Sequence, residues 1–238
     1  MNSYMNFWDK IFNFFGGIWD SFYQSVIYDN RYEFIFEGLL NTIIIAIGAA
    51  IIGIVIGIVT ALIRNNHDMN GKMKIGNKLS KWYVDIIRGT PSILQLMIIY
   101  YVIFKSVIVG ILAFGINSGA YVSEIIRAGI NSVDKGQFEA GYGLGLSYGK
   151  VMRYIILPQA FKNILPAMGN EFITLVKETA VGAYIGIVEL TKASDIIASR
   201  TYDYFFPLII IAIIYFAITL SLTKLFSRIE RRLNNVRS

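Results

Sequence analysis

The chain has 238 residues, of which 55% are hydrophobic and only 16% are charged, and its mean hydropathy is +0.55. Soluble globular domains usually carry about 25% charged residues, so this composition excludes an ordinary soluble domain, and the absence of cysteine excludes a disulfide-stapled secreted module. A net charge of +6 in so apolar a chain is more typical of the basic flanks of membrane segments than of nucleic-acid binding. We therefore expect an all-α integral membrane protein.

The first part of the chain, residues 1–34, is expected to be an external segment lying in the membrane interface. Its apolar side chains recur at helical spacing beside Trp8 and Trp19. They are Phe7, Ile11, Phe14, Ile18 and Phe22. A poorly ordered leader is the alternative interpretation of the same stretch.

About five transmembrane helices are predicted from the apolar stretches that follow. The expected spans are 39–63, 84–104, 106–126, 164–187 and 205–225. Pro91 is expected to break or bend the second span, and a short outer turn at Lys105 joins it to the third. The first span carries a small residue at every fourth position, which predicts close packing against another helix. These small residues are Ala49, Gly53, Gly57 and Ala61.

The basic residues predict how the chain is oriented in the membrane. The inner-loop candidate, 64–81, has five basic residues against one acid, and the tail after Leu222 again has five against one. The first 34 residues contain only two basic residues. The positive-inside rule therefore places the N-terminus outside, and places 64–81, 127–154 and 226–238 in the cytoplasm.

Polar side chains gather on one face of the fourth span, within about 120° on a helical wheel of ~100° per residue. They are Asn170, Glu171, Thr174, Lys177 and Glu178. Ionised groups facing lipid are costly, so this face either lines a transport pathway or forms a buried Lys–Glu network. The candidate substrate-binding residues from all spans are Glu178, Asn170, Thr174, Asn117, Tyr121 and Gln95.

Two of those candidates, Asn117 and Tyr121, share one face of the third span with Glu124. Glu124 and Arg127 fit a structural ion pair as well as a gate, and Gln95 fits a satisfied core glutamine as well as a pathway residue. The single histidine, His67, and the absence of cysteine leave no usual zinc ligand set and no Cys or Ser-His nucleophile. No phosphate-binding Gly-x4-Gly-Lys-Ser/Thr loop is present, so any ATPase must be a separate chain.

The central hydrophilic segment carries a recognisable motif: Glu139-Ala140-Gly141, then Gly145, then Ile155 and Leu157-Pro158. It resembles the EAA signature of permease subunits in ATP-binding cassette importers, with Gly141 where alanine is usual. Further stretches are similar to the polar-amino-acid branch of that family. They include Arg88-Gly89-Thr90-Pro91, Leu157-Pro158-Gln159-Ala160, Lys177-Glu178-Thr179 and Glu189-Leu190.

This resemblance implies the type I fold of ABC importer permeases, with the transmembrane domain at 35–233 and a cytoplasmic tail at 234–238. It also implies that Glu139, Ala140, Gly141 and Gly145 belong to a coupling helix, within the segment 127–154, that docks on an ATPase. The implied function is a permease subunit of an amino-acid importer in the bacterial plasma membrane. The chain would itself be neither catalytic nor cofactor-binding.

The implied partners are two copies of an ABC ATPase that bind ATP and Mg, and a second permease subunit, identical or homologous. An external amino-acid-binding protein and the lipid bilayer complete the set, and no nucleic acid is expected. The alternative function is a stand-alone ion-coupled carrier or channel that uses Glu124, Lys177 and Glu178 as a relay. The segment from Glu139 to Pro158 separates the two hypotheses, because a stand-alone carrier has no use for it.

Overall fold

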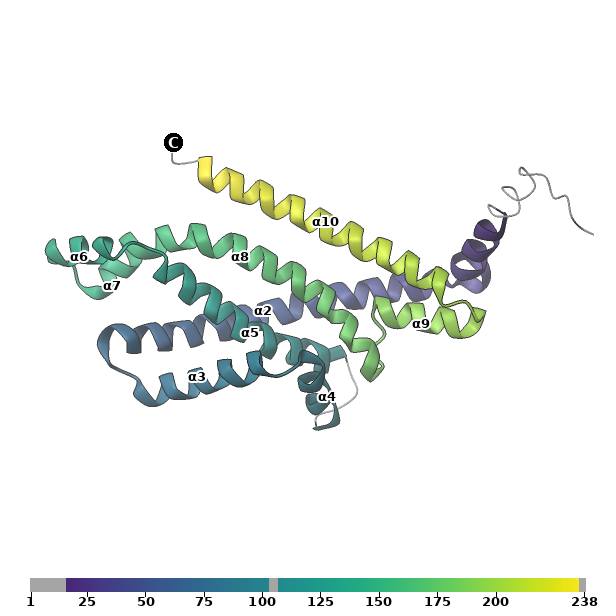
Figure 1. The fold of residues 1–238 in the computed structure, drawn as a ribbon, viewed down its shortest axis with the longest axis horizontal. Coiled ribbons are helices and arrows are strands. Elements are labelled where there is room, and N and C mark those ends of the chain that lie inside the picture. Colours follow the sequence, from purple (N-terminus) through teal and green to yellow (C-terminus); the bar gives the residue numbers. More distant parts are fainter. Residues whose placement is uncertain (1–15, 103–106, 236–238) are drawn as a thin grey trace, which may run out of the picture.

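The computed structural model describes residues 16–102 and 107–235, and this part of the chain is helical with no strand (Figure 1). The principal helices are α2 (Tyr32–Asn70), α3 (Lys74–Gly89), α4 (Ser92–Val102), α5 (Val107–Asn131), α6 (Lys135–Gly143), α7 (Tyr148–Val151), α8 (Leu157–Glu178), α9 (Leu190–Thr201) and α10 (Phe205–Asn235). Short π-helical and 3₁₀ segments lie at Tyr23–Ile27, Tyr28–Asn30, Met152–Ile156 and Thr179–Ile185. The expected all-α class is confirmed.

Three helices of the described chain are long and apolar enough to cross a membrane: α2, α5 and α10. They correspond to the first, third and fifth predicted spans. The second predicted span is interrupted, since α3 ends at Gly89 and the shorter apolar helix α4 begins at Ser92. Thr90 between them has an extended backbone, as expected for a residue before proline. The break predicted at Pro91 is therefore confirmed, whereas the turn at Lys105 lies outside the described residues.

The predicted inner loop at 64–81 is wrong in its extent. Helix α2 continues to Asn70 and α3 begins at Lys74, so only Gly71 to Met73 make the connection. Gly71 ends α2 in a left-handed conformation, and its N–H donates to the His67 carbonyl at 2.8 Å. The basic residues of this stretch thus lie mostly on two helix ends, because a left-handed glycine reverses the chain within three residues.

The first span packs closely along α5, as its small residues predict. A Cβ atom at Gly57 would lie 2.3 Å from Cγ1 of Val122, and one at Gly53 would lie 3.0 Å from the Ser118 side chain. No side chain fits at Gly57 without moving the backbone of α5. The predicted packing stripe is confirmed, and it sets the spacing of the two helices on which the rest of the bundle rests.

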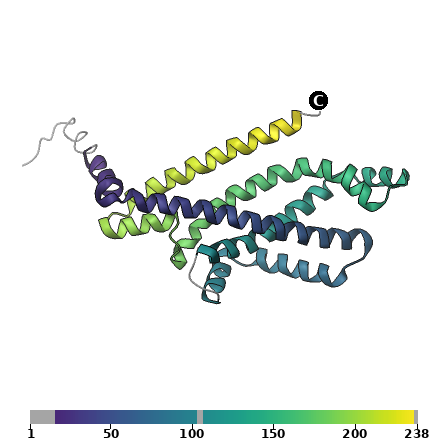
Figure 2. The ribbon, with the colours of Figure 1, turned by 180° about the vertical axis from the view of Figure 1, so that it is seen from behind.

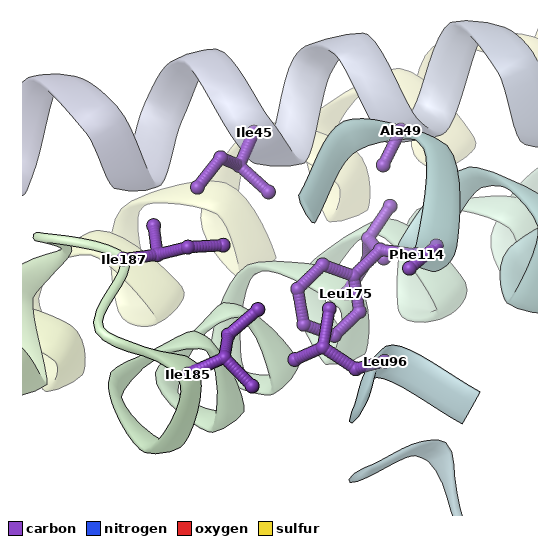
Figure 3. Close-up of a cluster of buried hydrophobic side chains, with 8 residues drawn as sticks. Ile45, Ala49, Leu96, Phe114, Leu175, Ile185 and Ile187 are labelled. Atoms are coloured by element: carbon purple, nitrogen blue, oxygen red, sulfur yellow. The ribbon is translucent and has the colours of Figure 1, made fainter. Parts of the chain in front are cut away.

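One apolar core cluster lies where α2, α4, α5 and the end of α8 meet (Figure 3). The buried cluster consists of Ile45, Ala49, Leu96, Ala113, Phe114, Leu175, Ile185 and Ile187. Leu175 brings α8 into this cluster, so its opposite face is turned away from the core. This packing decides which side chains of α8 are left accessible.

The two ends of the bundle carry different small helices. Helix α9 and the segment before α2 lie at one end, and α6 and α7 lie at the other (Figures 1 and 2). Helix α8 runs between the two ends. Helix α8 therefore connects the α6–α7 end to the end that carries α9.

Candidate functional site

Helix α8 presents its polar arc on its accessible side. Asn170, Thr174 and Lys177 are exposed, whereas Leu175 and Val176 between them are buried. Glu171 and Glu178 are half-buried at the edges of the arc. The arrangement brings together five groups able to contact a zwitterionic solute, two acids and one base among them.

The two acids of this arc differ in their hydrogen bonding. Oε1 of Glu171 accepts a hydrogen bond from the Ser118 hydroxyl of α5 at 2.7 Å. Within the described residues, Glu178 has no side-chain hydrogen bond and no basic group within 4 Å, Lys177 included. A half-buried carboxylate without a partner is available to an incoming ammonium group. The interaction of Glu171 with Ser118 was not predicted from the sequence.

Gln95 and Asn117 are held by each other. The Asn117 amide donates to the Gln95 side-chain oxygen at 2.9 Å, and Asn117 is buried. The Gln95 amide nitrogen in turn donates to the Ile87 carbonyl at 2.7 Å and lies 2.8 Å from the Thr90 hydroxyl. These bonds satisfy polar backbone groups left free by the break at Pro91. Gln95 is thus fully hydrogen-bonded but only partly buried, which fits either of its two alternatives.

Tyr121 and Glu124 lie farther along α5, among arginines. The Arg88 guanidinium sits over the Tyr121 ring, 5.5 Å from its centroid. Glu124 is ion-paired with Arg64 of α2, with Arg127 at 3.3 Å and with Arg88 at 3.8 Å. The predicted pair of Glu124 and Arg127 therefore exists, but as part of a larger cluster that joins three helices.

At the other end of the molecule, α6 exposes part of the motif and buries the rest. Asp134 caps α6 by accepting a hydrogen bond from the Gly136 N–H at 2.7 Å. Glu139 and Ala140 are exposed, whereas Gly141 is buried. A Cβ at Gly141 would lie 2.9 Å from Cγ2 of Val151. The small residue at this position allows the returning chain to pack on α6. The outward surface of the motif is therefore formed by Glu139 and Ala140.

The turn after α6 is built on Gly145, which is exposed and has φ of +73°. Its N–H donates to the Tyr142 carbonyl at 2.9 Å. The next helical turn is tied to the bundle by Tyr148, whose hydroxyl accepts a hydrogen bond from the Asn65 amide of α2 at 2.7 Å. Burial, together with the nearby Tyr142, raises the pKa of Tyr148, so this hydroxyl stays neutral.

A polar side chain that the sequence pattern gave little reason to select, Glu189, has no exposed surface. Its carboxylate caps α9 by accepting from the N–H groups of Thr191 at 2.9 Å and Lys192 at 2.7 Å. It also accepts from the Tyr215 hydroxyl of α10 at 2.8 Å. The flanking backbone is held by α2, where Asn41 donates to the Val188 carbonyl and Thr42 accepts from the Leu190 N–H. Only the Glu-Leu pair of the family resemblance pointed to this position.

Comparison with known proteins places these features in one family. Residues 53–235 match the model of the "binding-protein-dependent transport system inner membrane component" family. The arginine transport system permease protein ArtQ of Bacillus subtilis is 42% identical over 209 residues, which cover 85% of this chain and 93% of ArtQ. The L-cystine transport system permease protein TcyB of the same organism is 37% identical over 226 residues, 91% of each chain.

A solved structure shares the fold as well as the sequence. It is the crystal structure of an amino acid ABC transporter with histidines, with a TM-score of 0.79 and 45% identity, covering 84% of this chain and 94% of that one. The match to the family model includes both the polar face of α8 and the segment from Glu139 to Pro158. The chain therefore belongs to the family of inner membrane components of binding-protein-dependent transport systems, and its fold is that of a type I ABC importer permease.

Proposed function

We propose that this chain is the membrane-spanning permease subunit of an ATP-driven amino-acid importer and forms half of its translocation path. The relatives carry permease names for arginine and L-cystine, and the similar solved structure is of an amino acid transporter. A solute with an ammonium and a carboxylate group fits a face that offers both signs of charge. The choice among amino acids would rest largely on the external binding protein.

The proposed solute contacts are those of α8. Glu178 would bind the ammonium group, because its carboxylate is half-buried and lacks a hydrogen-bond partner within the described chain. Charge-assisted hydrogen bonds of this kind are roughly twice as strong as neutral ones. The exposed Asn170 and Thr174 would orient the remaining polar groups of the solute. Gln95 and Asn117 would support the wall of the path through α4 and α5 rather than contact the solute, and Tyr121 remains a candidate contact.

The proposed coupling surface is the outward side of α6 and the turn that follows. Glu139, Ala140, Tyr142, Leu144 and Gly145 are exposed there. An exposed Leu144 and an exposed acid on the same short segment are what a partner groove with apolar and basic lining would accept. Two ATPase subunits would bind ATP and Mg beneath two permease subunits, identical or homologous. This chain would then have no catalytic role of its own.

The proposed orientation follows the basic residues. We place in the cytoplasm the tail after Leu222, the end of α2 with the start of α3, and the helices α6 and α7. Helix α9 and the N-terminus would face outward in a bacterial plasma membrane. The absence of native cysteine makes single-cysteine labelling clean. A cysteine at Asn70 is expected to resist an impermeant maleimide added to intact cells, whereas one at Ser199 is expected to react. Reaction at Asn70 would reverse the orientation.

The observation that carries this function is the exposed Glu139–Ala140 surface on a short helix, set apart from the polar face of α8. A stand-alone carrier has no use for such a surface. The test is to express the chain with its ATPase and to purify the complex in nanodiscs. Adding the binding protein and amino acid should raise ATP hydrolysis severalfold over either one alone. Amino-acid uptake by the chain without any ATPase, driven by an ion gradient, would instead establish the carrier.

A further inference from the structure

Helix α3 has three distinct faces. On a helical wheel of ~100° per residue, the face that packs on α2 and α5 includes the buried Ser80 and Val84. A second face carries four large apolar side chains within an arc of about 60°. They are Ile75, Leu79, Trp82 and Ile86, and all four are exposed, Ile75 by 80% and Trp82 by 62%. Nothing in the described chain covers this second face.

The third face is basic and runs beside the apolar one, because each of its residues directly precedes an apolar residue in the sequence. Lys74, Lys78 and Lys81 lie on it, all exposed, followed by Asp85. Within the described residues none of the three lysines has an acidic group within 4 Å, Asp85 included. Three unneutralised lysines therefore lie along the edge of a contiguous apolar surface.

Contacts with α2 give the level of this surface in the membrane. A Cβ at Gly76 would lie 3.2 Å from Ile63, the last residue of the apolar stretch of α2 before Arg64. Lys74 and Lys78 lie within one turn of Gly76, and Lys81 lies in the turn after that. A lysine side chain is long enough to reach back along the helix to the polar edge of the bilayer. All three ammonium groups can thus meet at the level of the lipid headgroups, with the apolar face beside the acyl chains.

We infer that α3 binds an anionic lipid of the surrounding leaflet, with its phosphate at Lys74, Lys78 and Lys81 and its acyl chains along Ile75, Leu79 and Trp82. Charge complementarity carries this inference, because clustered basic residues beside a membrane helix attract acidic headgroups. Tryptophan favours the same interfacial level. A second copy of this chain is the less favoured occupant, since a protein partner would have to take three lysines out of water, which is costly unless each meets a matched acid.

Trp82 supplies the probe. The chain has three tryptophans, so Trp8→Phe and Trp19→Phe leave Trp82 as the only indole. This variant of the full chain is reconstituted in phosphatidylcholine vesicles that contain either brominated phosphatidylglycerol or brominated phosphatidylcholine at the same low mole fraction. Bromine quenches indole fluorescence only at contact. We expect the brominated phosphatidylglycerol to quench Trp82 about twofold more strongly, since lysines concentrate acidic lipid locally.

The matched variants separate a site from general surface charge. Replacing Lys74, Lys78 and Lys81 by glutamine should abolish the preference, and replacing them by arginine should retain it. Replacing Lys135, Lys150 and Lys162 by glutamine removes the same charge elsewhere and should leave the preference unchanged. Elution on size exclusion identifies any variant that fails to fold.

Two results would overturn the inference. Equal quenching by the two brominated lipids means that the lysines select no headgroup, and protection of Trp82 from both means that protein covers this face. Acidic lipid is present in both leaflets, so the readout does not depend on which way the chain inserts. It also needs no transport. A complex that transports amino acid but shows no lipid preference refutes only this inference, and the reverse result refutes only the proposed function.

Discussion

The two ends of the bundle are held together by opposite kinds of contact. At the α9 end, the buried Glu189 joins α9 to α10, and its neighbours in the chain are bonded to α2. At the α6–α7 end, by contrast, the described polar bonds lie at the margins, such as Asn163 to Ser132 and Asn65 to Tyr148, and the outward side chains are exposed. The polar groups at the α9 end are thus satisfied by the chain itself, whereas the α6–α7 end leaves side chains exposed to a partner.

This difference shows what each end needs. A buried carboxylate costs several kilocalories per mole unless it is fully hydrogen-bonded, so the α9 end is a rigid joint whose geometry the chain itself must specify. The α6–α7 end carries exposed Glu139 and Leu144 on a segment that packs inward through Gly141 on Val151 and through a buried apolar cluster that includes Val151 and Ile156. Substitutions should therefore act on stability at the α9 end and on partner coupling at the other.

The largest effect on stability is expected for Glu189→Ala. The change removes the cap of α9 and leaves the Tyr215 hydroxyl without its acceptor. A lost cap costs about 1 kcal/mol, and each buried unsatisfied group costs about 1–3 kcal/mol, so we expect a loss of about 3 kcal/mol. The measurement is the thermal unfolding midpoint of the purified chain in detergent, together with its yield.

Two controls sharpen this test. Glu189→Gln keeps a side-chain oxygen in place and should lose less than the alanine variant. Asp195→Ala removes an exposed acid from the same helix and should leave the midpoint unchanged. An unfolding midpoint for Glu189→Ala equal to that of the parent chain would refute the rigid joint.

At the opposite end, Glu139→Lys is expected to uncouple transport without loss of the protein. Reversing this charge should weaken docking of the ATPase, and a loss of about 1.4 kcal/mol in docking energy corresponds to about a tenfold weaker complex. Uptake and stimulated ATP hydrolysis are measured in the reconstituted complex, alongside the amount of ATPase that co-purifies. Glu230→Lys, at an exposed position near the end of α10, is the matched control. Equal coupling in both variants would remove Glu139 from the docking surface.

At the last residue of α8, Glu178→Gln tests the proposed solute contact. Hydrogen bonds to charged groups contribute about 1.5–3 kcal/mol, so uptake should fall about tenfold or more while the yield and the basal ATPase activity stay the same. Glu171→Gln is the control, because a glutamine oxygen can still accept from Ser118. Loss of assembled complex in Glu178→Gln, or uptake as in the parent chain, would rule out a role for this carboxylate in solute binding.

The structure also shows why some features could be predicted from the sequence and others could not. Helical period alone placed Asn170, Thr174 and Lys177 on one face, and the break at Pro91 follows from proline itself. Both are local properties of the chain. The same holds for the close approach of α2 and α5 at Gly57, which is predicted by small residues at a four-residue spacing.

The missed features all depend on residues far apart in the chain. Burial of Glu189 requires Tyr215 and the start of α2, and the bond from Asn41 to Val188 spans 147 positions. Asn117 shares a helical face with Tyr121, yet it is buried because α4 places Gln95 against it. The periodicity of a single sequence does not show which distant residues pair. Polar residues on one helix face were therefore predicted to have the same surroundings, whereas their burial and partners differ.

A change at Gly145 separates backbone geometry from docking at the α6–α7 end. Its φ of +73° is left-handed, and no atom would lie within 4 Å of an added Cβ, so substitution strains the backbone without any clash. Gly145→Ala should raise the conformational energy of the turn by about 1–2 kcal/mol. Gly145→Asn should raise it less, because asparagine tolerates the left-handed conformation. Gly143→Ala, where φ is ordinary and space is also open, should be neutral or slightly stabilising. The measurement is stimulated ATP hydrolysis at equal amounts of bound ATPase.

Recovery with asparagine means that Gly145 serves only to turn the chain, and that the partner contacts Glu139 and Leu144. Equal loss with alanine and asparagine means instead that the partner approaches the backbone at Gly145 itself, and the open surface then extends past α6 into the turn.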